Sequence, residues 1–140
     1  MAQNWFNSPS IRSARSLDIV RIVVALVLSV HSINRIIAGD VPGFGEFLDS
    51  KGFPLGVGLA WLITLSTLAA SVALIIRRLI VPACICHLIV LIMGIFMSHM
   101  HHGWFVVGGG TNGMEYSVVL IACLSAVLWS YWPKKNNILA

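Results

Sequence analysis

The sequence predicts an all-α integral membrane protein, built as a bundle of four transmembrane helices. The first observation is composition: of 140 residues, 58% are hydrophobic and 10% are charged, and the mean hydropathy is +0.90. Soluble domains carry about 25% charged residues, so a soluble fold this apolar could not cover its own surface. The second observation is a series of apolar runs, each long enough to cross a hydrocarbon core of about 30 Å. We expect one domain, residues 1–140, with spans at about 17–38, 58–76, 79–98 and 114–132.

The three connections differ in character. Residues 39–56, GDVPGFGEFLDSKGFPLG, are rich in Gly and Pro, which indicates a loop with one short interfacial helix around 46–51. The second connection is only Arg77-Arg78, which predicts a tight helical hairpin. Pro82 then falls in the first turn of the next helix, where its missing N–H is tolerated. The third connection, residues 99–113, is uncharged apart from its histidines.

The distribution of basic residues predicts the orientation. Seven Lys/Arg residues fall on one side of a four-span arrangement and two on the other: Arg12, Arg15, Arg21, Arg77, Arg78, Lys134 and Lys135, against Arg35 and Lys51. Cytoplasmic loops carry the excess of positive charge, so both termini are expected to be cytoplasmic, in a plasma membrane that would be the inner membrane of a bacterium. Because these charges form no basic stripe, the net charge of +4 does not indicate nucleic acid as a partner.

Ionisable side chains within a span are costly and need a reason. Asp18 and Arg21 are one turn apart and can pair at the cytoplasmic end of the first span, as a cap with a snorkelling arginine or as part of a site. His31, Asn34 and Arg35 crowd the outer end of the same span. His31 and Arg35 share a face, which leaves open a structural role or a functional site.

The second and third spans carry fewer polar groups. Thr64, Thr67 and Ser71 recur at i, i+3 and i+7, which predicts a stripe of small polar side chains for helix–helix packing. His87, near the middle of the third span, is expected to be a hydrogen-bonded interior residue.

The outer end of the third span gathers imidazole and thioether groups: Met97, His99, Met100, His101 and His102. Copper prefers such ligands, and imidazole alone suits zinc. Against a metal site, His101 and His102 are adjacent and cannot both point inward on a helix, and the cluster contains no cysteine or carboxylate. Metal binding by Met97, His99, Met100 and His102 is therefore only an alternative.

Glu115 opens the last span. A carboxylate in the first turn suits the positive end of a helix, which is the structural interpretation. Glu115 is also predicted to lie on the same side of the membrane as His31, Arg35, His99 and His102. If the bundle brings these side chains together, they form a polar pocket on the outer side, with an arginine or histidine as the partner of Glu115.

The residues also carry a family resemblance. Arg21 and His31 in the first span, GFGEFLDSKGFP in the first loop, Arg78 in the hairpin turn, HMHHGWFV after the third span and NGMEYSVVLI into the fourth resemble the DoxX family of membrane proteins. The resemblance extends over essentially all of the spans. Its most specific parts are the histidine-containing end of the third span and the Asn-Gly-x-Glu-Tyr start of the fourth.

The resemblance implies a four-helix inner-membrane protein. Named relatives include a subunit of a thiosulfate:quinone oxidoreductase and a membrane partner of a sulfurtransferase and a superoxide dismutase in oxidant defence. The resemblance also places a set of residues at the family's polar positions: His31, His99, His102, Asn112, Glu115 and Tyr116. One departure is Thr67, where many relatives carry a glutamate, and this puts any activity that depends on that carboxylate in doubt.

Together these observations favour a redox-associated membrane subunit whose outer pocket holds a quinone head group or a sulfur anion. The sequence has no haem-attachment, flavin or nucleotide motif, so electrons would come from a partner redox subunit, and the chain is not expected to be an enzyme on its own. Two alternatives stay open: a structural or assembly subunit, and a small metal-handling or transport protein. We expect membrane lipid to surround the chain, and the sequence leaves open whether the chain forms homo-oligomers.

Overall fold

The structure, a computed structural model, describes residues 11–133, with side chains from Ser16 onward. Every regular element in this range is helical, and no strand occurs in it. In chain order the elements are α1 (Ile11–Ile37), α2 (Val41–Ser50), α3 (Gly56–Ile75), α4 (Ile80–Met97), the 3-10 turn η1 (His99–His102) and α5 (Glu115–Tyr131). The all-α prediction is confirmed for this range. Of the basic residues used to predict orientation, Lys134 and Lys135 lie outside it, as do the side chains of Arg12 and Arg15.

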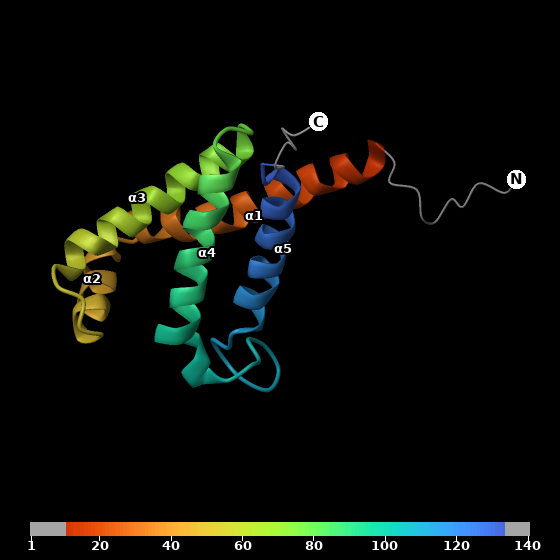
Figure 1. Cartoon of the computed structure of the whole chain (residues 1–140). Helices are drawn as coiled ribbons and strands as arrows, with labels where there is room; N and C mark the ends of the chain where they lie inside the picture. The colour runs from red at the N-terminus through yellow and green to blue at the C-terminus, as the bar shows by residue number, and fades with distance from the viewer. Residues whose placement is uncertain (1–10, 134–140) are drawn as a thin grey trace, which may run out of the picture.

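The helices form two antiparallel pairs that meet at one end (Figure 1). Helix α1 packs against α3, α3 against α4, α4 against α5, and α5 against α1. The part of α1 around Asp18, the α3–α4 turn and the end of α5 lie together at what we call the Asp18 end, and the first turns of α1 extend beyond it. Towards the opposite end, α1 and α3 lean away from α4 and α5. We call this opposite end, with α2 and the 98–114 loop, the loop end.

Three of the described helices are long and apolar enough to cross a membrane, over Ser16–Ile37, Gly56–Ile75 and Ile80–Met97. Helix α5 is apolar but shorter, with 17 residues. At 1.5 Å per residue it is about 26 Å long, somewhat less than the hydrocarbon core. The predicted spans agree with the helices within one or two residues, except that α1 begins six residues before the predicted start at residue 17.

The short helix expected around 46–51 is α2, and it begins earlier, at Val41. A proline in its first turn explains this early start, because the fixed φ of proline is already helical and its missing N–H is not needed there. Val41 and Leu48 are buried against Ala60 of α3. Helix α2 therefore covers the start of α3 at the loop end.

The contact between α2 and α3 depends on two glycines. A Cβ on Gly56 would meet the carbonyl oxygen of Gly45 and lie 2.6 Å from Cγ of Asp49, while a Cβ on Gly45 would lie 2.6 Å from Cα of Val57. The Asp49 carboxylate accepts a hydrogen bond of 2.9 Å from the backbone N–H of Gly56. This bond satisfies one of the N–H groups left free at the start of α3.

The α3–α4 turn is as tight as the sequence predicts. Arg77 and Leu79 both have a left-handed backbone, with φ of 61° and 51°. The N–H of Arg78 donates to the carbonyl of Ala73 at 2.9 Å, which closes the end of α3. A left-handed backbone raises the conformational free energy of a non-glycine residue, so the turn has a fixed and strained geometry.

The main core lies between the four long helices. Each of these helices contributes at least one of the most buried side chains, which are Ala25, Leu74, Cys84, Leu124 and Val127. The three cysteines are free, and Cys84 is fully buried.

The glycine contact gives a first prediction. Gly56→Ala should lower the free energy of unfolding by about 1–3 kcal/mol, because backbone atoms of α2 must move to admit the methyl group. Thermal unfolding of the purified protein in detergent measures the change. Gly58→Ala on the same helix is the matched control, since a Cβ there meets nothing within 4 Å. Equal stability of the Gly56→Ala and Gly58→Ala proteins would contradict the close α2–α3 contact.

Candidate functional site

Asp18 connects three parts of the chain at the Asp18 end. Its carboxylate lies 3.2 Å from the guanidinium of Arg21 and 3.8 Å from that of Arg77, and it accepts a hydrogen bond of 3.1 Å from the Tyr131 hydroxyl. Arg21 is 4% exposed and also donates to the carbonyl of Ile75 at 3.4 Å. The predicted pair of Asp18 and Arg21 thus belongs to a larger cluster that joins α1 to the α3–α4 turn and to α5.

The polar stripe on α3 binds the two neighbouring helices. Thr67 and Ser32 of α1 share a hydrogen bond of 2.8 Å, and Ser71 shares one of 3.2 Å with Nε2 of His87 on α4. All four side chains are buried. These bonds confirm the prediction that the stripe serves helix packing and that His87 is a hydrogen-bonded interior residue.

Arg35 turns inward rather than snorkelling away from the bundle. Its Nη1 donates to the hydroxyl of Thr64 at 3.1 Å, and its guanidinium carbon lies 4.1 Å from the ring centroid of Phe44 on α2. Arg35 therefore fastens α2 and α3 to the end of α1. His31 and Asn34 are exposed, and no hydrogen bond of either side chain is seen within residues 11–133.

The predicted histidines lie around the 98–114 loop. Nδ1 of His99 donates to the carbonyl of Asn112 at 2.9 Å, and Nδ1 of His102 donates to the carbonyl of Ser98 at 3.0 Å. The first of these bonds spans the loop, and the second lies within the turn that contains η1.

The same loop positions Glu115. Three backbone hydrogen bonds of 3.0–3.2 Å join its two arms, from the N–H groups of Gly113, Met114 and Glu115 to the carbonyls of Phe105, Gly103 and Trp104. A Cβ on Gly113 would meet the carbonyl oxygens of Trp104 and Phe105, so the arms approach this closely only with glycine there. The N–H of Val106 donates to Oε1 of Glu115 at 2.9 Å. Oε2 has no hydrogen-bond partner among the described residues.

Glu115 borders an open pocket at the junction of this loop and α5, and several of its lining side chains, Trp104, Val107 and Val119 among them, are exposed. The pocket has a volume of about 410 Å³ and a mostly apolar lining: Trp104, Val106, Val107, Glu115, Tyr116, Val118 and Val119. Pockets that hold small molecules are typically apolar, with a few polar groups that orient the ligand. One partly buried carboxylate in an apolar, aromatic surrounding meets this description.

The polar residues that the sequence predicts at the outer side thus separate into two groups. Glu115 and Tyr116 line the pocket, and Asn112, His99 and His102 belong to the adjoining loop. The other group is at the end of α1, with Arg35 bound to Thr64. Across residues 16–133, no hydrogen bond or ion pair joins the α1 group to the loop group.

Metal ligation by the loop histidines is a separate question of geometry. Within residues 11–133, no three His, Cys, Asp or Glu side chains are arranged so that they could hold a metal ion. Of the two methionines considered as metal ligands, Met100 is exposed and Met97 packs against the α2–α3 contact.

Sequence reasoning missed the partners rather than the polar residues. The Tyr131 hydroxyl, for example, binds a carboxylate 113 residues earlier in the chain, and no sequence pattern indicates this pairing. Trp104, Val106 and Val107 carried no signal of a pocket, except that Trp104 and Val106 lie within the loop segment resembling DoxX.

These features define an all-helical membrane protein with buried polar contacts between its helices and a pocket at one end. The sequence profile of the DoxX family matches residues 16–100, more than half of the chain. The chain belongs to the DoxX family. The matched segment includes the apolar part of α1 and all of α2, α3 and α4, while Glu115 and α5 follow it. No curated protein and no solved structure matches the chain.

The α3 stripe predicts that two serine-to-alanine substitutions on this helix differ in their effect on stability. Ser71→Ala should lower the free energy of unfolding by about 0.5–2 kcal/mol, because the buried imidazole of His87 loses its partner. Reversible unfolding in mixed micelles measures the change. The matched control is Ser66→Ala on the same helix, because among the described residues the Ser66 hydroxyl bonds only to the carbonyl of Ile63 in its own helix. A loss as large in Ser66→Ala would refute the interhelical role of Ser71.

The loop geometry predicts that alanine substitutions at two of its glycines have different effects. Gly113→Ala should separate the two arms of the loop and raise hydrogen exchange at the N–H groups of Val106 and Glu115. Gly109→Ala is the control, because a Cβ there makes only ordinary contact, at 3.4 Å, with the ring of Phe105. Exchange measured by mass spectrometry should rise in the first protein alone, and equal exchange in both would show that the close approach at Gly113 is not needed.

Proposed function

We propose that this DoxX protein is a subunit of a redox-linked assembly in a bacterial inner membrane, and that its Glu115 pocket receives a quinone head group. The observation that carries the proposal is the environment of Glu115. One carboxylate oxygen is held by the N–H of Val106 at 2.9 Å, and the carboxylate borders a largely apolar pocket of about 410 Å³. A quinone ring is flat and apolar, with carbonyl oxygens at its edge, so the pocket suits it in size and chemistry.

The lining residues offer aromatic, apolar and hydrogen-bonding contacts to a quinone. Trp104 and Tyr116 offer aromatic surface against a ring, and Val118 and Val119 offer apolar contact along α5. Oε2 of Glu115 is the group placed to hydrogen-bond a carbonyl or hydroxyl at the edge of the ring.

The chemistry assigned to the protein is proton transfer. A bound quinone supplies reversible uptake of electrons together with protons. Oε2 of Glu115 would hold the exchanging proton, while the bond from Val106 keeps the carboxylate in one orientation. His99, bound to the carbonyl of Asn112, lies on the same loop and would be the imidazole that relays the proton.

Electrons come from a partner subunit in this proposal. The sequence carries no haem-attachment, flavin or nucleotide motif. The family resemblance, which includes a subunit of a thiosulfate:quinone oxidoreductase, motivates the same arrangement.

The proposed topology has four spans with both termini in the cytoplasm. Its support is the gathering of Arg21, Arg77 and Arg78 at the Asp18 end, while the pocket lies at the loop end. Helix α5 completes the bundle through its contacts with α4 and α1. In this orientation the Glu115 pocket faces the periplasm.

A second candidate function is a structural or assembly subunit without chemistry of its own. The observation that favours it is that several polar side chains at membrane depth bind one another: Ser32 with Thr67, Thr64 with Arg35, and Ser71 with His87. At Thr67, where relatives often carry a glutamate, the hydroxyl serves packing. Glu115, whose Oε2 has no hydrogen-bond partner within residues 11–133, distinguishes the two functions.

The test is Glu115→Gln in the native host, compared with Glu46→Gln. Glu46 is an exposed glutamate on α2, so its replacement controls for the loss of one charge. Glu115→Gln should reduce quinone-linked respiration of membranes by about 10²-fold or more, as expected for loss of a proton-transfer group. It should also reduce the quinone that co-purifies with the protein, while Glu46→Gln leaves both unchanged.

Two results would reject the quinone proposal. One is full respiratory activity with Glu115→Gln in protein that is folded and present at the normal level. The other is a wild-type protein that co-purifies with partner subunits but never with quinone, which would favour the assembly role.

A further inference from the structure

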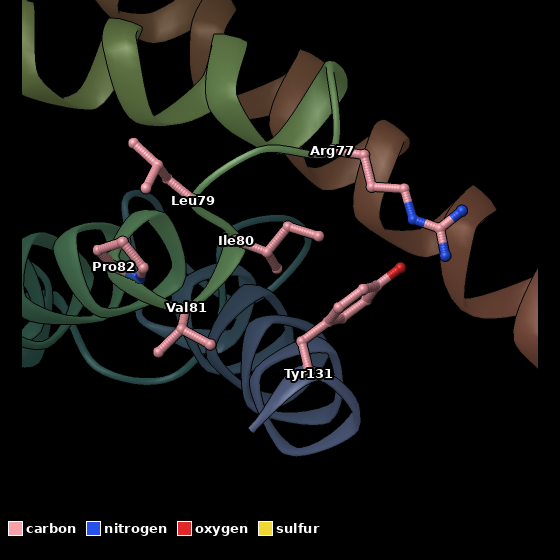
Figure 2. A pocket seen from close by; sticks show the side chains of 6 residues that line it. All are labelled: Arg77, Leu79, Ile80, Val81, Pro82 and Tyr131. Atoms are coloured by element: carbon pink, nitrogen blue, oxygen red, sulfur yellow. The ribbon is translucent and has the colours of Figure 1, made fainter. Parts of the chain in front are cut away.

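A second pocket lies at the Asp18 end, opposite the proposed quinone site. It is an open depression of about 360 Å³ between the α3–α4 turn and the end of α5, lined by Arg77, Leu79, Ile80, Val81, Pro82 and Tyr131. Figure 2 shows the guanidinium of Arg77 and the hydroxyl of Tyr131 directed towards each other on one side, with the apolar side chains on the other. The pocket therefore has a polar edge and an apolar floor.

The polar edge carries more positive than negative charge. Asp18 is the only carboxylate that pairs with a basic group in the described part of the chain, and Arg21 and Arg77 share it. Arg21 is the closer partner at 3.2 Å and is buried, whereas Arg77 lies 3.8 Å away. One carboxylate against two guanidinium groups leaves a net positive charge at this edge.

Arg77 is held in place and is still available to a ligand. Its side chain is 62% exposed, and the long contact with Asp18 leaves most of its N–H donors free. Its guanidinium carbon lies 5.8 Å from the ring centroid of Tyr131, and its left-handed backbone fixes where the side chain starts. Strained residues of this kind collect at ligand-binding sites.

The position of the pocket selects the type of ligand. The apolar span of α3 ends at Ile75 and that of α4 begins at Ile80, so the turn between them lies where hydrocarbon gives way to head groups. Basic pockets between helices at this depth bind the phosphates of anionic lipids. Arginine suits a phosphate because its planar fork can donate two parallel hydrogen bonds.

We infer that this pocket, which we call the Arg77 pocket, binds the phosphate head group of an anionic phospholipid. Arg77 donates to the phosphate oxygens, and Leu79, Val81 and Pro82 contact the first methylenes of the acyl chains. Leu79 is 74% exposed, which suits a side chain covered by lipid. A free phosphate ion would gain nothing from this apolar floor.

The test uses the full-length protein in detergent, titrated with phosphatidylglycerol or with phosphatidylcholine, and the bound lipid is counted by native mass spectrometry. We expect phosphatidylglycerol to bind at least about fivefold more tightly than phosphatidylcholine. Arg77→Gln should abolish this preference. Arg78→Gln removes the same charge one residue away but outside the pocket, and it should keep the preference.

Two further measurements guard against a loss of fold and against a free-anion site. Val81→Trp fills the pocket while leaving both arginines in place, and it should lower phosphatidylglycerol binding as Arg77→Gln does. Inorganic phosphate in excess should not displace the lipid. The inference is overturned if both lipids bind equally, if Arg78→Gln is as harmful as Arg77→Gln, if Val81→Trp has no effect, or if inorganic phosphate replaces the lipid.

Discussion

The hydroxyl stripe on α3 is the feature on which the rest of the structure depends. In a hydrocarbon surrounding, buried polar groups gain most when they bond to one another, and Thr64, Thr67 and Ser71 find their partners on two different helices. These contacts fix the rotation of α1 and α4 about their own axes. Apolar packing in lipid could not do this alone, because a lipid tail and a leucine side chain offer similar contacts.

The Asp18 end and the loop end of the bundle differ in character. At the Asp18 end, a shared carboxylate draws α1, the α3–α4 turn and α5 together, and excess positive charge borders an open pocket. At the loop end, the two helix pairs lean apart, and the polar groups of each pair form their contacts within that pair. Arg35 binds Thr64 and Phe44, while the 98–114 loop folds onto itself and presents Glu115. The two pockets therefore lie at opposite ends of the bundle.

Much of the fold could be predicted because hydropathy and chain length restrict helices in a membrane strongly. The ends of α1 and α4 at Ile37 and Met97 lie within a residue of their predicted positions. The start of α2 was missed because Gly45, a weak helix former, outweighed the helix-start signal of Pro42, although Gly45 permits the close approach to α3. The polar residues of the site were also apparent from sequence. Their partners were not, since Arg35 bonds across helices to Thr64 and Glu115 to a backbone N–H, and both depend on helix rotation and loop path.

The packing of α1 on α3 through Ser32 and Thr67 is tested most directly by disulfide formation in native membranes. With Cys84, Cys86 and Cys123 replaced by alanine, Ser32→Cys and Thr67→Cys would be combined, because the native hydroxyl oxygens lie 2.8 Å apart. The control combines Ser32→Cys with Leu65→Cys on the exposed face of α3. We expect mild oxidation to link the first pair and leave the second free, as seen by mass spectrometry. No link in the first pair, or equal linking in both, would contradict the central role of the stripe.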